Sequence, residues 1–217
     1  MFVLQGNIGA GKTTLLNRLR GRHPDVHVVL EPVDKWTSMR DSTGKSIFQK
    51  FYEDPSMYAF AFQMYVTLTR LNAEKTQGGE SDQRLFLYER SVSTDKRVFM
   101  RTLVESGVCS EIESNIYDRW FNEVQPARRS VTGTVYLRVD PEECHRRVSK
   151  RNRDGEEGVS KEYLDQLHAA HDEWLMPDGR ARPDVIVVRD NSAEDVDRVY
   201  AFLNTKHEKR NANLSII

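Results

Sequence analysis

The stretch Gly6-Asn7-Ile8-Gly9-Ala10-Gly11-Lys12-Thr13 decides the fold, because it fits the phosphate-loop pattern G-x-x-x-x-G-K-[S/T] at every fixed position. Its glycines let successive backbone N–H groups converge on phosphate oxygens, while a helix N-terminus and Lys12 add positive charge. The Thr13 hydroxyl can ligate the Mg²⁺ that bridges the phosphates, and we include the next residue, Thr14, in the site. The pattern predicts a binding site for a nucleoside triphosphate, with ATP and Mg²⁺ as the expected ligands.

Around this loop, short apolar runs alternate with segments of helix length. We expect strands at Phe2–Gln5, Val26–Glu31, Leu85–Tyr88, Thr134–Val139 and Asp184–Val188. We expect helices at Lys12–Arg20, Pro55–Lys75, Thr94–Ser106, Ser110–Glu123, Glu142–Lys150, Lys161–Leu175 and Ala193–Lys206. Such alternation is typical of β-α-β crossovers. The sequence therefore predicts an α/β fold with a five-stranded parallel sheet flanked by helices.

Composition excludes several classes of protein. The 217 residues carry 33 acidic and 32 basic side chains, a net charge of −1, which argues against a nucleic-acid-binding coat. No apolar run approaches the roughly 18 residues that span a bilayer. The two cysteines, Cys109 and Cys144, fit no metal or redox spacing. We expect no signal segment and a cytoplasmic protein, with no membrane or nucleic-acid partner and a frayed tail at 208–217.

Two predicted strands end in carboxylates, at the sheet edge where α/β proteins bind their ligands. The strand at Leu85–Tyr88 runs into Glu89 and Arg90, a carboxylate that can hold magnesium and a cation that can reach an oxyanion or a hydroxyl. Glu31 ends another strand and can accept a proton from an attacking hydroxyl. A surface ion pair and a capping or solvated glutamate remain the alternatives.

The phosphate loop does not by itself identify the phosphate acceptor. A GTPase normally carries the guanine-reading pattern N-K-x-D, whereas Asn204-Thr205-Lys206-His207 lacks the aspartate. Motor and helicase ATPases usually have longer chains and an apolar strand that ends in aspartate. Phosphoryl transfer needs mainly positioning and charge neutralisation, so one base, one metal and several cations would suffice.

Five blocks of sequence together resemble the deoxynucleoside kinase family, the group of deoxycytidine kinase, deoxyguanosine kinase and the insect multisubstrate enzyme. In chain order they are GNIGAGKTT (6–14), EPVDKW (31–36), FYEDPSMYAFAFQMYVTLTR (51–70), YERSVSTDKRVF (88–99) and RRVSKRNRDGEEGVSKEYLDQLHAAHDEWL (146–175). The resemblance runs from Met1 to about Phe202. It implies a single P-loop kinase domain over 1–217, with an arginine-rich lid at about 147–158. It also implies ATP-dependent 5′-phosphorylation of deoxynucleosides for nucleotide salvage, by a homodimer.

The resemblance assigns the chemistry to a small group of residues. Glu31 falls on the family's general base toward the 5′-hydroxyl, and Arg90 on the arginine that contacts that hydroxyl and the transferring phosphate. Lys12 completes the catalytic set, while Glu89 corresponds to the magnesium-associated carboxylate beside Thr13.

The resemblance also outlines the nucleoside site. Tyr52 and Glu156 match the pair that hydrogen-bonds the sugar 3′-hydroxyl, and Gln63 matches the glutamine that reads the base. A buried amide on an otherwise apolar helix needs partners, which independently points to a ligand. The aromatic walls fall on Trp36, Phe62 and Phe99. For the two phenylalanines, ordinary core packing remains open.

In the lid, the resemblance implies that Arg147, Arg151 and Arg153 close over the triphosphate. Arginines placed there neutralise the charge that develops during transfer, as an arginine finger does. A solvated basic face or a nucleic-acid patch is the alternative. The neighbouring acids Asp154, Glu156 and Glu157 argue against nucleic acid, because they would repel a phosphate backbone.

Arg70 and Asp95 bear on the choice of base. In the family, this pair accompanies enzymes for deoxycytidine and purine deoxynucleosides, whereas thymidine-accepting members carry smaller or apolar residues that leave room for the thymine methyl. Val66, a branched residue, narrows the space for purines, so the choice among these three bases stays open.

Three alternatives to this assignment remain open: a thymidine-preferring member of the family, a nucleoside monophosphate kinase and a catalytically silent structural relative. A monophosphate kinase needs a basic site for the acceptor's own phosphate, where this sequence has Glu31. A silent relative could lose Lys12, Glu31 or Arg90, and all three are present. For the implied dimer, the candidate helices are Pro55–Lys75 and Thr94–Ser106.

Overall fold

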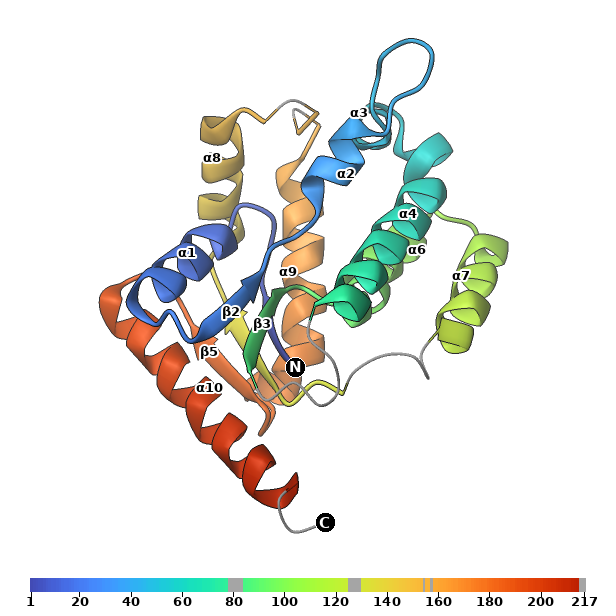
Figure 1. The fold of residues 1–217 in the computed structure, drawn as a ribbon. Coiled ribbons are helices and arrows are strands. Elements are labelled where there is room, and N and C mark those ends of the chain that lie inside the picture. The colour runs from blue at the N-terminus through green and yellow to red at the C-terminus, as the bar shows by residue number, and fades with distance from the viewer. Residues whose placement is uncertain (78–83, 125–129, 154, 157, 215–217) are drawn as a thin grey trace.

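The computed structural model describes residues 1–77, 84–124, 130–153, 155–156 and 158–214. In these residues the chain forms one five-stranded parallel sheet, in the order β2-β3-β1-β4-β5 (Figure 1). The strands are β1 (Phe2–Gln5), β2 (Val26–Val29), β3 (Leu85–Glu89), β4 (Gly133–Leu137) and β5 (Val185–Val188). β1 lies in the middle and pairs with β3 and β4, and every residue of these three strands is buried. Near-continuous apolar strands of this kind are typical of a sheet that is covered on both faces.

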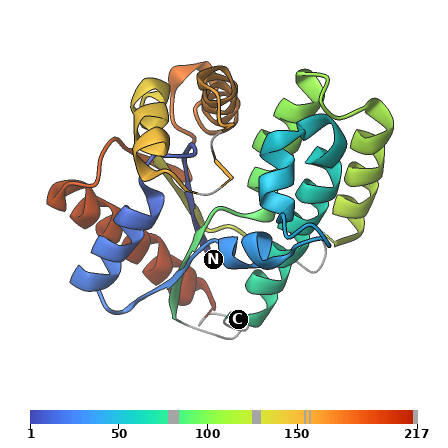
Figure 2. The same ribbon diagram turned by 90° about the horizontal axis from the view of Figure 1, so that it is seen from above.

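Helices cover the sheet on both sides. The helices of the described residues are α1 (Lys12–Arg22), α2 (Val33–Ser38), α3 (Ile47–Glu53), α4 (Pro55–Thr76), α5 (Val92–Thr94), α6 (Arg101–Glu105), α7 (Glu111–Val124), α8 (Pro141–Arg151), α9 (Lys161–Leu175) and α10 (Ala193–Leu214), with a π-helical stretch η1 (Asp95–Met100) and a short 3₁₀ turn η3 (Pro177–Gly179). Figures 1 and 2 show α1 and α10 on one face of the sheet and α9 on the other.

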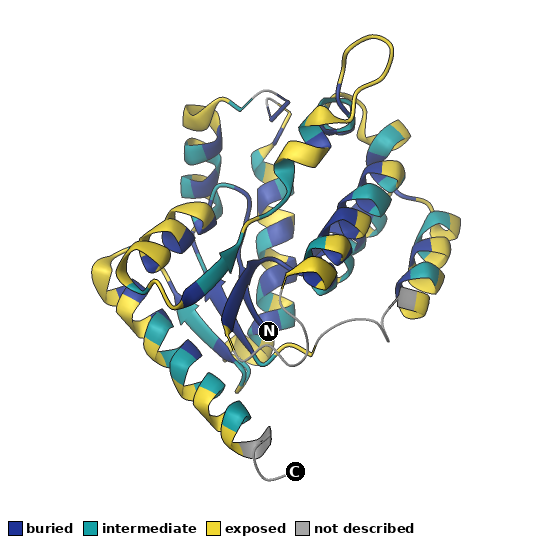
Figure 3. Ribbon diagram, viewed as in Figure 1, coloured by how far each residue is buried: buried dark blue, intermediate teal, exposed yellow. Residues whose placement is uncertain are grey.

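A second group of helices stands beside the sheet and builds its own apolar cluster. α3, α4, α6 and α7 contribute most of it, with Trp36 from α2, and aromatic rings such as Phe51, Phe62 and Tyr117 fill its interior. Figure 3 shows buried residues where these helices face one another and exposed residues on their outer sides. This cluster is distinct from the core that packs on the sheet, and a cavity lies where the two layers meet.

The local sequence explains where the helices nearest the cleft begin. Ser46 caps α3 in a capping box with Gln49, each side chain bonding the other residue's backbone N–H. α4 begins at Pro55, and the Asp54 side chain accepts the N–H of Met57. These caps fix the direction of both helices at the rim of the cleft.

The α/β fold class and the parallel five-stranded sheet are confirmed. Three details differ: β2 ends at Val29, so that Glu31 lies beyond the strand; the segment 94–106 is interrupted by η1; and α2 and α3 were not predicted. Of the expected tail, residues 208–214 continue α10, while 215–217 lie outside the described residues. Side-chain hydrogen bonds one helical turn apart, such as Asn204 to Glu208, support that extension. Among the described helices, none has the length and apolar character needed to cross a bilayer.

Candidate active site

The phosphate loop connects the end of β1 to the start of α1. Gly9 has φ +78°, and a Cβ there would collide with the carbonyl oxygen of Cys144, so this position requires glycine. Lys12 is buried, and its Nζ donates to the carbonyl oxygen of Asn7 at 2.9 Å. Burial, assisted by the charge of Arg90, lowers the pKa of Lys12 to about 8. The loop therefore presents its lysine in a dry, confined setting.

Thr13 and Glu89 bring two oxygen ligands together beside this lysine. The Thr13 hydroxyl donates to the carboxylate of Glu89 at 3.3 and 3.4 Å, and Lys12 Nζ lies 3.9 Å from the same carboxylate. Hydroxyl and carboxylate oxygens are the ligands that Mg²⁺ prefers, so the residues present fit the predicted metal. The arrangement follows from the fold, because Glu89 ends β3 at the register position beside Leu4 of β1.

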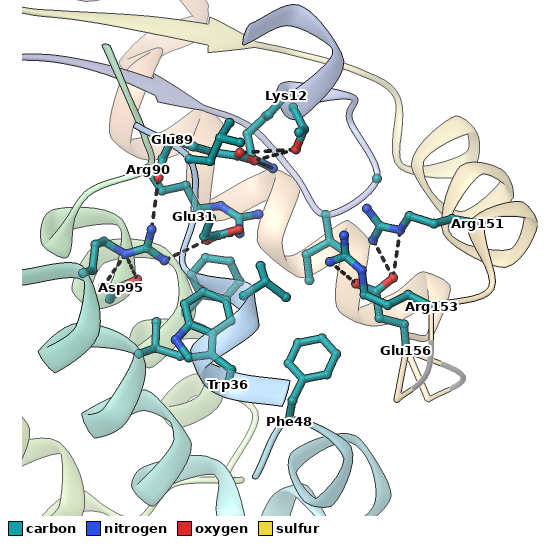
Figure 4. A pocket seen from close by; sticks show the side chains of 18 of the residues that line it. Lys12, Glu31, Trp36, Phe48, Glu89, Arg90, Asp95, Arg151, Arg153 and Glu156 are labelled. Atoms are coloured by element: carbon teal, nitrogen blue, oxygen red, sulfur yellow. Dashed lines mark hydrogen bonds and ion pairs between the residues drawn. The ribbon is translucent and has the colours of Figure 1, made fainter. Parts of the chain in front are cut away.

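Glu31 lies at the centre of a buried charge cluster, which Figure 4 shows together with Arg90 and Asp95. Its Oε1 accepts from Arg70 Nη2 at 2.8 Å and from Arg90 Nη1 at 2.8 Å. Burial alone would raise the pKa of Glu31, but the charges of Arg90 and Arg70 outweigh it and hold the pKa well below its usual range. Glu31 is therefore ionised and held in one position.

Arg70 connects this cluster to Asp95. Its Nε donates to the two carboxylate oxygens of Asp95 at 3.1 and 3.0 Å, and its Nη1 donates to the carbonyl oxygen of Glu89 at 3.1 Å. Both members of the pair are buried, with side-chain exposures of 4% and 0%. One arginine from α4 thus contacts the exit of β2, the end of β3 and the start of η1.

The walls of the pocket are aromatic. Trp36 donates from Nε1 to Thr69 Oγ1 at 2.9 Å, and its ring meets Phe62 edge-on at 5.9 Å. The ring of Phe99 lies under the guanidinium of Arg90, with the carbon 4.8 Å from the ring centroid. Gln63 is buried, and its Oε1 has no partner among the described residues. A buried acceptor without a partner is costly, so a ligand that donates to it would be favoured here.

The lid arginines are divided between two positions. Arg147 belongs to α8 and donates from Nη1 to the carbonyl oxygen of Ala10 in the phosphate loop, at 2.8 Å. Arg151 and Arg153 both donate to Glu156, at 3.1 and 3.2 Å, and form a separate group across the pocket in Figure 4. The first part of the predicted lid is thus helix, and its arginines are paired with groups of the protein itself. Asp154 and Glu157 lie outside the described residues.

The structure brings the predicted site together around one cavity of about 470 Å³. Every residue predicted to bind the nucleoside lines it, as do both predicted magnesium ligands and the three lid arginines. Gly6, Asn7 and Ala10 do not line it; Asn7 instead donates from Nδ2 to the Leu164 carbonyl oxygen at 2.8 Å and supports the loop from behind. Phe48 also lines the cavity and was not predicted; it lies one turn before Tyr52 on α3 and packs edge-on against it. Its signal was an aromatic residue four positions away on the same helix face.

Comparisons with known proteins agree with this geometry. A family model described as deoxynucleoside kinase matches residues 2–210. The chain is 34% identical to deoxycytidine kinase 1 of Xenopus laevis, over 79% of this chain and 72% of the relative. It is 33% identical to human deoxycytidine kinase, over 80% and 74%, and 33% identical to human mitochondrial thymidine kinase 2, over 95% and 80%. Because the family model matches nearly the whole chain, this protein belongs to the deoxynucleoside kinase family.

Proposed function

We propose that this deoxynucleoside kinase transfers the γ-phosphoryl group of ATP to the 5′-hydroxyl of deoxycytidine or a purine deoxynucleoside in preference to thymidine. The observation that carries the preference is the buried Arg70–Asp95 ion pair at the floor of the pocket. The chain is 33% identical both to human deoxycytidine kinase and to human mitochondrial thymidine kinase 2, so overall identity does not indicate the preferred base.

The floor of the pocket disfavours a methyl group for electrostatic reasons. We propose that the base faces the buried Arg70–Asp95 pair, where a thymine methyl would gain little from burial against paired charges. Gln63 offers an amide whose Oε1 lacks a partner among the described residues, so it favours a base that presents a donor. Cytosine and adenine supply such a donor with the exocyclic amino group and thymine supplies one with N3–H, so the proposed preference rests on the Arg70–Asp95 pair and not on Gln63.

In the proposed reaction, Glu31 accepts the proton of the 5′-hydroxyl as the 5′-oxygen attacks the γ-phosphorus, and the bond from that phosphorus to the β,γ-bridging oxygen breaks to release ADP. Arg90 contacts both Glu31 and the phosphoryl group, and Lys12 neutralises phosphate charge. The low pKa of Glu31 makes it a weak base while both arginines are bound to it. Transfer of Arg90 to the phosphate would relieve this effect and raise the proton affinity of Glu31 at the moment it is needed.

We propose Thr13 and Glu89 as the residues that hold magnesium, directly or through water. Their oxygens already lie within 3.4 Å of each other, next to Lys12. The ion would neutralise charge on the phosphates of ATP.

Tyr52 and Glu156 are proposed to bind the sugar 3′-hydroxyl from opposite sides. Both residues line the cavity. The backbone at Gly158 lies close against α3: a Cβ added there would be 2.7 Å from the Tyr52 carbonyl oxygen. Glu156 also accepts from the two lid arginines, so we propose that ATP draws these arginines toward its phosphates.

We also propose that the protein forms a homodimer and that it works in the cytoplasm. Large apolar side chains are exposed on α4 and α7, namely Met57, Leu68, Ile112 and Ile116. A buried hydrogen bond between Thr67 and Tyr117 joins these two helices. Within residues 94–106, all of them described, no large apolar side chain is exposed, so we propose α7 in place of that segment as the second contact helix. The two buried cysteines are unpaired thiols, which favours a reducing compartment.

A phosphorylation assay with ATP and Mg²⁺ tests the substrate proposal. Each of the four deoxynucleosides is compared with its monophosphate. We expect product from deoxycytidine or a purine deoxynucleoside and little from thymidine. Strong thymidine activity would overturn the interpretation of the pocket floor, and phosphorylation of the monophosphates alone would contradict the assignment of the acceptor.

A further inference from the structure

Arg90 has a backbone conformation that its residue type rarely adopts. Its φ is +62°, in the left-handed region, and it is the only described non-glycine residue with positive φ that lines the cavity. The conformation turns the chain sharply from β3 into α5 and sends the side chain across the pocket to Glu31. Such a conformation persists only where surrounding contacts hold it.

The backbone groups of this turn have identifiable partners. The N–H of Arg90 donates to the carbonyl oxygen of Leu4 at 2.9 Å. The N–H of Ser91 donates to Thr94 Oγ1 at 3.0 Å, and that hydroxyl donates in turn to Gln5 Oε1 at 2.9 Å. β1 and the first turn of the following helix therefore hold one side of the turn.

Helix α4 holds the other side with two side chains four residues apart, on one helix face. Arg70 donates to the carbonyl oxygen of Glu89, immediately before Arg90. Glu74 accepts the N–H of Val92, two residues after Arg90, at 3.3 Å through Oε1. The two contacts thus bracket Arg90 from before and after.

Glu74 has no place in the chemistry described above. It is buried, with 3% of its surface exposed, and does not line the cavity. A buried carboxyl group is costly unless it makes useful hydrogen bonds, and a helix N-terminus is a favourable partner for it. Its bond to the first N–H of α5 supplies such a partner.

We infer that Glu74 is a positioning residue, which holds the Glu89–Val92 turn so that the Arg90 guanidinium reaches Glu31 and the transferring phosphoryl group. This inference rests on the role proposed for Arg90. It predicts a defect in the chemical step with ATP binding preserved, because the phosphate loop makes no contact with Glu74 in the contacts described above.

The test compares kcat, the KM for ATP and the melting temperature across a set of variants. Glu74→Ala removes the acceptor, and we expect kcat to fall about 10- to 100-fold, the range that a misplacement of about 1 Å produces. Glu74→Gln keeps an acceptor of equal reach and should stay within about threefold of the parental kcat. The KM for ATP should change little in both. If Glu74→Ala does not fold, Glu74→Asp, which shortens the reach by one methylene, takes its place.

Leu71→Ala is the matched stability control, since Leu71 is equally buried on the same helix and belongs to the apolar cluster. It should lower the melting temperature and leave kcat near the parental value. A fall in kcat that merely follows the melting temperature across Leu71→Ala and the Glu74 variants would overturn the inference.

A double-mutant cycle with Arg90→Ala separates this inference from the proposed function. If Glu74 acts through Arg90, removing Glu74 should cost little more once the arginine is absent. An equal fold-loss from Glu74→Ala in both backgrounds would overturn the positioning role. A parental rate for Arg90→Ala itself would instead overturn the role proposed for Arg90.

Discussion

The two charge clusters of the pocket differ in how firmly they are built. Glu31, Arg70 and Asp95 lie in the interior, where Arg70 bonds both carboxylates and Arg90 bonds Glu31 as well. Arg151 and Arg153 on the opposite side are 38% exposed and share one carboxylate, Glu156. Electrostatic interactions are stronger where water is excluded, so the inner cluster is preorganised, whereas solvent screens the lid pairs.

This contrast suggests a division of work. In the proposed reaction, the inner cluster would orient the hydroxyl and the base without reorganisation during the chemical step. The lid pairs are weak enough to exchange one partner for another, as residues that must contact phosphates should. Substitutions in the inner cluster are therefore expected to cost much more activity than substitutions in the lid.

Glu31→Gln should have the largest effect. It keeps the shape of the side chain but removes the base, and we expect kcat to fall about 100- to 1,000-fold, within the range typical of general-base catalysis. ATP binding, measured directly by calorimetry, should be nearly unchanged. Glu53→Gln is the control, because Glu53 is an exposed glutamate paired only with Lys45 among the contacts described. A Glu31→Gln variant that works at the parental rate would show that another group takes the proton.

All three residues of the inner cluster were predicted from the sequence, with Arg70 and Asp95 as a pair, but the contact of this pair with Glu31 was not predicted. The phosphate loop and the Glu89-Arg90 pair are local patterns, which a strand and a turn bring to one sheet edge. The contact between Arg70 and Glu31 depends instead on how α4 packs against the exit of β2, over 39 positions of sequence. Tertiary packing of this kind leaves no local pattern.

Glu74 shows the same limit more clearly. Near the end of a long helix, and followed by Lys75, it has the pattern of a solvated charge. Only the close approach of α4 to α5 buries it against the N–H of Val92. Likewise, the pairing of Arg151 and Arg153 with Glu156 depends on a loop conformation that composition does not specify.

The double variant Arg70→Met with Asp95→Ala should change the ranking of substrates. Removing both partners avoids leaving one buried charge unpaired, and it opens space for the thymine methyl. We expect the thymidine-to-deoxycytidine ratio of kcat/KM to rise about tenfold or more, the usual worth of a methyl-sized pocket change. Absolute rates should fall for every substrate, because Arg70 also contacts Glu31. An unchanged ranking would mean that the pair does not select the base.

The effect of pH on the KM for ATP should be as large as, or smaller than, the change in substrate ranking. Because burial lowers the pKa of Lys12 to about 8, the lysine loses its charge in the free enzyme as the pH rises above that value. The charged fraction falls to about one tenth at pH 9, so the apparent KM for ATP should rise roughly tenfold between pH 7 and pH 9. Between pH 8 and the unperturbed value of 10.5, the unfolded chain binds more protons at this site, so Lys12 itself adds stability as pH rises. A loss of affinity above pH 8 without a matching fall in melting temperature would confirm the titration, and a pH-independent KM would contradict it.

Arg151→Ala should have the smallest effect, and it tests the outer half of the comparison. Its ion pair with Glu156 is exposed at the arginine, so stability should change by no more than about 0.5 kcal/mol. We expect the KM for ATP to rise about threefold, as one of several cations that contact the triphosphate is lost, with kcat nearly retained. Arg146→Ala is the matched control, since Arg146 lies on the same helix, pairs with Glu143 and does not line the cavity. A loss of kcat as large as that of Glu31→Gln would mean that the lid takes part in the chemical step as strongly as the inner cluster, because an interaction made only in the transition state lowers kcat without changing substrate binding.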